Sequence, residues 1–175
     1  PLLHAQYPEL INAIPASHRP DILDGDLAII SEKIDYLGVN YYTRAYVKDD
    51  GSDDPCQLPA PEHAEKTAMG WEVYPQGLTD LLLQLHNDYT VPPIIITENG
   101  LASDDVLASG EVNDEQRIRY LTTHLDAVAS AIEQGVDITG YFVWSLLDNF
   151  EWALGYEKRF GIIYVDYETQ KRTLK

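Results

Sequence analysis

Three short apolar stretches of this sequence end in polar or aromatic side chains that could act on a sugar. They end in Asn40-Tyr41-Tyr42, in Glu98-Asn99-Gly100 and in Trp144-Ser145, and Glu151-Trp152 follows a little further on. A carboxylate such as Glu98 can attack an anomeric carbon if it is held ionised and aimed, and a neighbouring phenol can hold it by a hydrogen bond. An indole can cover the apolar face of a pyranose ring. The set therefore suits carbohydrate chemistry.

Each of these residues also has a simpler explanation. A carboxylate after an apolar stretch is often a helix cap or an ion-pair partner, and a tryptophan belongs to a protein core more often than to a binding site. The functional interpretation depends on convergence, because buried strands have little reason to end repeatedly in groups that are costly to remove from water.

Apolar periodicity predicts three strands that alternate with two helices. Residues 48–61, rich in Asp, Gly, Ser and Pro, are expected to form a solvated loop. Alternating strands and helices indicate right-handed βαβ units and a parallel sheet, and in a βα-barrel the active site lies at the carboxyl ends of the strands. The expected elements are strands over residues 35–42, 93–97 and 140–145, a helix over 75–86, and a helix from the N-cap Asn113 to Gly135.

Both predicted helices carry apolar residues at helical spacing, and we expect these faces to be buried. In the first helix they are Leu78, Leu81, Leu82 and Leu85, and in the second they are Ile118, Leu121, Leu125, Val128 and Ile132.

Composition excludes several classes of partner. The 175 residues suffice for one domain, and the formal net charge of -17 disfavours both nucleic acids and anionic membranes. The sequence contains no apolar run as long as a membrane span, and no signal peptide is visible. We expect a cytoplasmic location. Secretion stays open, because the chain starts at Pro1 rather than Met and is expected to be truncated at the N-terminus.

The combined motifs resemble those of glycoside hydrolase family 1, the β-glucosidase family. Ile96-Thr97-Glu98-Asn99-Gly100 is similar to the family's nucleophile motif, residues 35–42 resemble its sixth barrel strand, and residues 144–152 resemble its eighth strand with the following loop. The likeness continues through Arg159-Phe160-Gly161 to Val165-Asp166 and covers nearly the whole chain.

The resemblance implies retaining hydrolysis of terminal β-D-glucosides, with a β-glucoside or short β-linked oligosaccharide as substrate and neither metal nor cofactor. A packing role is favoured for Trp71, in a Gly-Trp pair that also matches the family. The implied site residues are Glu98 as nucleophile, Tyr42 as its hydrogen-bond donor, Asn40 as a pocket amide, Trp144 as the platform beneath the glycone, Glu151 and Trp152 as partners of its outer hydroxyls, and Phe160 in the pocket wall.

The same resemblance implies an α/β chain that is a partial (β/α)8 TIM barrel. Residues 1–175 would form the C-terminal portion of a single glycosidase domain, with about its last three strands and their helices. Retaining enzymes need two carboxyl groups, and the family's acid/base glutamate lies in an Asn-Glu-Pro motif that this sequence lacks. Three parallel strands would leave two open sheet edges and an uncovered inner face. We therefore expect packing against the missing N-terminal half of the barrel, or self-association.

Three alternatives accompany this prediction. The chain could be a non-catalytic half-barrel fragment that folds or assembles with a partner half. A phospho-β-glycosidase is disfavoured, because Glu151 would repel a phosphate. A thioglucosidase stays open, since that class differs at the acid/base position, which this sequence does not contain.

Overall fold

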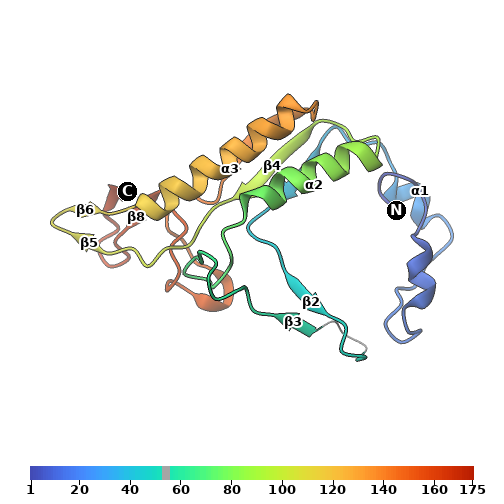
Figure 1. Ribbon diagram of the computed structural model, residues 1–175, viewed down its shortest axis with the longest axis horizontal. Helices are drawn as coiled ribbons and strands as arrows, with labels where there is room; N and C mark the ends of the chain where they lie inside the picture. Colours follow the sequence, from blue (N-terminus) through green and yellow to red (C-terminus); the bar gives the residue numbers. More distant parts are fainter. Residues whose placement is uncertain (53–55) are drawn as a thin grey trace.

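The structure is a computed structural model that describes residues 1–52 and 56–175. Its centre is a sheet of three parallel strands in the order β1-β4-β7 (Figure 1). The elements in chain order are η1 (Glu9–Ala13), α1 (Asp26–Ile30), β1 (Leu37–Asn40), β2 (Tyr46–Lys48), β3 (Cys56–Leu58), α2 (Pro75–Asp88), β4 (Ile94–Asn99), β5 (Leu107–Ala108), β6 (Glu111–Val112), α3 (Glu115–Glu133), β7 (Ile138–Val143), η2 (Trp152–Leu154), β8 (Ile163–Val165) and β9 (Arg172–Leu174).

The predicted alternation of strand and helix is confirmed. Helix α2 connects β1 to its neighbour β4, and α3 connects β4 to β7. In the centre of the sheet Val39 pairs with Ile96, which in turn pairs with Tyr141. Because all three strands run in the same direction, their carboxyl ends lie at one edge of the sheet, where the candidate site residues were expected.

The hydrophobic core lies between the sheet and the two long helices, which run side by side across one face of it (Figure 1). Leu78 and Leu82 of α2 and Ile94 and Ile96 of β4 are fully buried there. The predicted apolar face of α2 is thereby confirmed, since Leu81 and Leu85 pack against the same core.

The predicted buried face of α3 is wrong at three of its five residues, whereas Val128 is buried and Leu121 is partly buried. Ile118, Leu125 and Ile132 are 59%, 47% and 49% exposed. Polar and small side chains face the core instead, and the polar ones can be buried because they are hydrogen-bonded or ion-paired. The residues buried along α3 are Arg117, Tyr120, His124, Ala127, Val128 and Ala131. The N-cap of α3 is Asp114, one residue after the predicted Asn113. The Asn113 side chain accepts a hydrogen bond from the Glu115 amide.

The opposite face of the sheet is open to solvent over the described residues. Phe142 is 61% exposed there, and Asn40 at the end of β1 is also exposed. A parallel strand is normally covered on both faces. Within the part of the chain that the structure describes, this face therefore lacks the covering layer that parallel sheets normally have.

The prediction of a loop over residues 48–61 is only partly right. Strands β2 and β3 form an antiparallel ribbon in which Tyr46 pairs with Leu58 and Lys48 with Cys56. Strands of three residues are too short to give a periodic signal in the sequence. The predicted loop also includes residues 53–55, which lie outside the described part of the chain.

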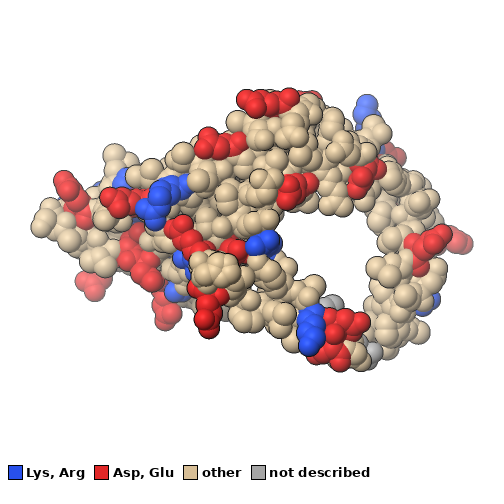
Figure 2. All heavy atoms as spheres, in the orientation of Figure 1, with Lys and Arg blue, Asp and Glu red and all other residues tan. Residues whose placement is uncertain are grey.

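The N-terminal segment, residues 1–36, contributes no buried residue. Leu10, Leu23 and Ile29 are 74%, 68% and 75% exposed. This segment curves away from the sheet, and Figure 2 shows an opening between it and the region of the β2–β3 ribbon. Among the described residues, no helix combines the length and the apolar character that a membrane span needs.

Candidate active site

The side chains of Tyr42 and Glu98 meet at the carboxyl ends of β1 and β4. The phenol of Tyr42 donates a hydrogen bond of 2.7 Å to Glu98 Oε2. Asn40 is the strand partner of Glu98, and the Tyr41 amide donates to the Glu98 carbonyl at 2.9 Å. The predicted pairing of a strand-end carboxylate with a neighbouring phenol is therefore present.

Electrostatics keep the Tyr42 phenol protonated. Burial raises its pKa well above the usual range, and the hydrogen bond to Glu98 and the negative charges of Glu98 and Glu151 raise it further. A phenol that does not ionise remains a hydrogen-bond donor at any physiological pH. Tyr42 can therefore stabilise a carboxylate at position 98 without itself taking up charge.

Trp144 follows β7 and lies directly beside the end of β4. Its amide donates to the Asn99 carbonyl at 2.9 Å, and a Cβ atom added to Gly100 would lie 1.8 Å from the Trp144 carbonyl oxygen. No side chain fits at position 100, so glycine permits the two strand ends to approach. The Trp144–Ser145 peptide bond is cis.

An aromatic wall lies next to Tyr42. The ring centroid of Phe160 is 6.0 Å from that of Tyr42, and the ring of Trp71 is 5.6 Å from Tyr42 and 6.3 Å from Phe160. Phe160 is only 2% exposed. The packing role expected for Trp71 agrees with these contacts, which place it beside the candidate site.

The other predicted site residues lie on the surface of the same region. Asn40 accepts a hydrogen bond of 2.6 Å from Thr97 Oγ1 on the open face of the sheet. Glu151 is partly buried at the start of η2 and influences the Tyr42 phenol electrostatically. Trp152 is 81% exposed. The individual roles of all seven predicted residues stay predictions.

Arg117 of α3 was not foreseen in the sequence, although it holds the loops behind the site. Its guanidinium is 1% exposed and forms ion pairs with Asp105, at 3.0 Å, and with Asp114. It also donates to the carbonyl oxygens of Leu101, at 3.3 Å, and Arg159, at 3.0 Å. Arg117 thus connects the loop after β4 to the segment that leads into the aromatic wall.

Asp148 forms the second half of this buried ion cluster. Its carboxylate accepts hydrogen bonds from the Gly161 amide at 3.0 Å and from Arg159 Nη1 at 2.6 Å, and it pairs with Lys175 at 2.7 Å. Lys175 also forms an ion pair with Asp105. The side chains of Lys175, Asp105 and Asp148 are all fully buried. The cluster fixes the backbone on both sides of Phe160.

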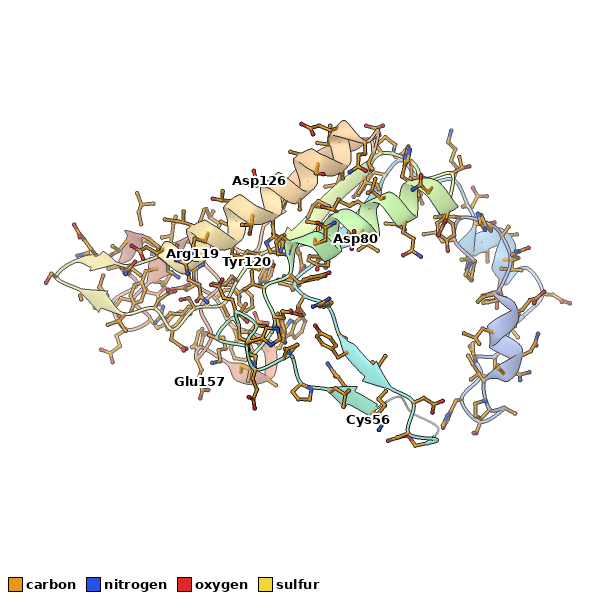
Figure 3. All side chains as sticks on the ribbon, in the orientation of Figure 1. Cys56, Asp80, Arg119, Tyr120, Asp126 and Glu157 are labelled. Carbon is orange, nitrogen blue, oxygen red and sulfur yellow. The ribbon has the colours of Figure 1, made fainter. Side chains whose placement is uncertain are left out.

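Tyr120 and His124 were also missed. Tyr120 lies on α3 (Figure 3) and is 1% exposed, and His124 stacks on it with ring centroids 3.8 Å apart. The available signal was the spacing of Asp114, Arg117, Tyr120 and His124, which places all four near one face of a helix. That face also carries small apolar residues, so it faces the core.

Comparison with known proteins agrees with this geometry. The profile of glycosyl hydrolase family 1 matches residues 1–175. The chain is similar to β-glucosidase A of Thermotoga maritima, at 48% identity over 177 residues, and to a β-glucosidase of Agrobacterium sp., at 44% identity over 180 residues. These matches cover all of this chain but only 40% and 39% of the two relatives.

Solved structures give the same result. A family 1 β-glucosidase from Thermotoga maritima superimposes with a TM-score of 0.91 at 46% identity, and its complex with isofagomine lactam with 0.92. Each superposition covers 99% of this chain and 39% of the solved chain. The prediction of a partial (β/α)8 barrel is confirmed. By sequence and by fold, the chain belongs to glycosyl hydrolase family 1.

Proposed function

We propose that this chain supplies the nucleophile and the glycone-binding part of a retaining β-glucosidase, as the C-terminal portion of a single (β/α)8 domain. The observation that carries the proposal is the hydrogen bond of 2.7 Å between the Tyr42 phenol and Glu98 Oε2. A carboxylate with one oxygen held in this way keeps its other oxygen for attack on a sugar.

The reaction proceeds by two displacements. In the first, a Glu98 oxygen forms a bond to the anomeric carbon while the bond from that carbon to the aglycone oxygen breaks, and the aglycone oxygen takes a proton from a general acid. In the second, water attacks the same carbon, gives its proton to the same group, now a base, and releases Glu98. Tyr42 stabilises the carboxylate when it leaves.

The surrounding residues recognise the sugar. Trp144 covers the apolar face of the glycone, Glu151 and Trp152 accept and donate hydrogen bonds at its outer hydroxyls, and Phe160 closes the wall behind Tyr42. The Thermotoga maritima β-glucosidase has been solved with deoxynojirimycin and with castanospermine, which supports a β-glucoside or short β-linked oligosaccharide as the substrate class here.

The general acid comes from outside this chain. The sequence contains no Asn-Glu-Pro motif, and the chain spans about 40% of the length of its relatives. The solvent-exposed face of the sheet, with Phe142 61% exposed, supports a covering partner, either the remainder of the barrel or a second copy. The alternative function is a non-catalytic half-barrel that only assembles.

Covalent trapping tests the catalytic proposal without requiring the general acid. A 2-deoxy-2-fluoro-β-glucoside with a dinitrophenol leaving group needs little protonation, so it should label the chain on Glu98, as read by intact and peptide mass spectrometry. Glu98→Gln should abolish labelling, and Glu133→Gln, at an exposed position of α3, should leave it unchanged. Labelling elsewhere, or none at all, contradicts the proposal.

A second pair of measurements separates the two functions. Size exclusion with light scattering gives the assembly state, and turnover of a chromogenic β-glucoside gives activity. A self-associated chain that can be trapped but does not turn over lacks only the acid, which supports the catalytic role. A cooperatively folding monomer overturns the expected requirement for a covering partner.

A further inference from the structure

A buried polar network lies directly behind the Glu98–Tyr42 pair, on the helix side of the sheet. Its centre is Asn99, which follows Glu98 in β4 and is fully buried. The Asn99 amide nitrogen donates to the Tyr41 carbonyl at 2.7 Å and to the Tyr120 phenol oxygen at 3.1 Å. Consecutive residues of a strand point to opposite faces, so Asn99 is directed away from the sugar-facing side.

Hydrogen bonds fix the orientation of the Asn99 amide and of the two phenols that contact it. The Tyr141 phenol donates to Asn99 Oδ1 at 2.5 Å, and the Tyr120 phenol donates to the Tyr42 carbonyl at 3.0 Å. Both hydrogens of the Asn99 amide and its oxygen are thus used, so the amide has one orientation only. Burial raises the pKa of Tyr120 and of Tyr141, so both phenols remain donors.

The ring of Tyr120 is itself held in place. It stacks on His124 with centroids 3.8 Å apart and an interplanar angle of 21°, and His124 Nδ1 donates to the Tyr120 carbonyl at 2.7 Å. Figure 3 shows Tyr120 on α3, and its burial means that it faces the strands. Helix α3 therefore reaches across the layer between helix and sheet to contact the backbone of Tyr42.

We propose that Tyr120, with Asn99, is a positioning residue for the Glu98–Tyr42 hydrogen bond. The Tyr120 phenol fixes the Tyr42 backbone, while Asn99 fixes the strand end next to Glu98, so the same network sets the position of both partners. Tyr120 touches neither the sugar nor the reacting carboxylate. Small displacements matter here, because a catalytic group misplaced by about 1 Å can slow a reaction about a hundredfold.

The inference rests on the proposed function, and trapping by the 2-fluoro glucoside tests it. Tyr120→Phe removes only the hydroxyl, and we expect its limiting trapping rate to fall about tenfold, as expected for one lost hydrogen bond. The half-saturating concentration should stay constant, because Tyr120 does not touch the sugar. Tyr141→Phe, which keeps Tyr120, should give a smaller effect in the same direction.

The matched control is Thr79→Val. Thr79 is 4% exposed and its hydroxyl donates to the Ala127 carbonyl at 3.0 Å, so this change also removes a buried hydroxyl, but one that joins α2 to α3 away from the site. It should lose comparable thermal stability and keep the unsubstituted trapping rate. Equal slowing in Thr79→Val, or an unchanged rate in Tyr120→Phe, overturns the positioning role.

Crystal structures of the same variants distinguish this inference from the proposed function. If the unsubstituted chain cannot be trapped, the proposed function fails. The positioning role still predicts that the distance from Tyr42 Oη to Glu98 Oε2 lengthens in Tyr120→Phe, lengthens by less in Tyr141→Phe, and is unchanged in Thr79→Val. An unchanged distance in both tyrosine variants refutes it.

Discussion

His124 should make the stability of this protein fall as the pH is lowered. Its side chain is fully buried, and Nδ1 donates to the Tyr120 carbonyl, which leaves Nε2 without a hydrogen-bond partner among the described residues. Burial lowers the pKa of His124 to about 4, against 6.5 for an unperturbed histidine. Between about pH 4 and pH 6.5, His124 is therefore protonated in the unfolded chain but remains neutral in the folded chain.

The sign and size of the effect follow from this difference. Because the folded pKa is the lower one, the contribution of His124 is fully present above pH 6.5 and is lost as the pH falls towards 4. At pH 5 the two values give a loss of about 2 kcal/mol in the free energy of unfolding relative to pH 8. Tyr41 and Tyr120, whose rings face His124, do not titrate in this range.

The assay is urea unfolding at pH 8 and pH 5, at one protein concentration, on the unsubstituted chain and on His124→Phe. Phenylalanine preserves the stacking on Tyr120 but cannot take up a proton, so the difference between the two pH values should shrink by about 2 kcal/mol. Carboxylates contribute equally to both chains and cancel. His86→Gln, at an exposed position, controls for loss of a histidine. If the free energy of unfolding depends on pH equally in the unsubstituted chain and in His124→Phe, the reasoning is refuted.

Three further changes should have separate effects. Tyr42→Phe should slow trapping of Glu98 about 10- to 100-fold, because a hydrogen bond to a charged group is worth about 1.5–3 kcal/mol; inactivation kinetics measure this. Gly100→Ala should cost at least about 3 kcal/mol in the free energy of unfolding, because its Cβ would lie 1.8 Å from the Trp144 carbonyl oxygen. Lys175→Met should cost about 3–5 kcal/mol by leaving the buried ion cluster with one more carboxylate than cations, as measured by urea unfolding.

Each of these changes has a matched control. Tyr36→Phe removes a phenol that is 54% exposed and should leave trapping unchanged. Gly140→Ala adds a Cβ 3.2 Å from the Ile95 side chain, which can adjust, so it should cost much less than the change at position 100. Lys171→Met alters an exposed lysine and should change stability by less than about 0.5 kcal/mol. If a control changes the trapping rate or the free energy of unfolding as much as its test variant does, the argument for that test variant is contradicted.

The sequence predicted those features that repeat along the chain or stand at strand ends. Periodicity located three strands and two helices, and the residues that close the strands predicted the contact between Tyr42 and Glu98. The same reasoning failed for α3, because periodicity counts Ile118 and Leu125 as core residues and Tyr120 and His124 as surface residues. Which stripe of a helix is buried depends on what packs against it, and the hydrogen-bond partners of the Tyr120 phenol, Asn99 and Tyr42, are 21 and 78 positions away in the chain.

The buried ion cluster was unpredictable for a related reason. Four residues of the cluster stand 12 or more positions apart in the sequence: Asp105, Arg117, Asp148 and Lys175. Each of them belongs to a residue type that is usually exposed to solvent. Only the tertiary fold brings their charges together. The expected cytoplasmic location and the individual roles of all seven predicted site residues depend on information outside the fold of this chain, and they stay predictions.

The exposure of the N-terminal segment has a consequence for how denaturation data on this protein are interpreted. The slope of the unfolding free energy against denaturant concentration scales with the surface newly exposed on unfolding. No residue among 1–36 is fully buried, so unfolding this segment exposes less new surface per residue than unfolding the rest of the chain. The slope should therefore be smaller than the value expected from 175 residues, and using that value would overestimate the free energy extrapolated to water.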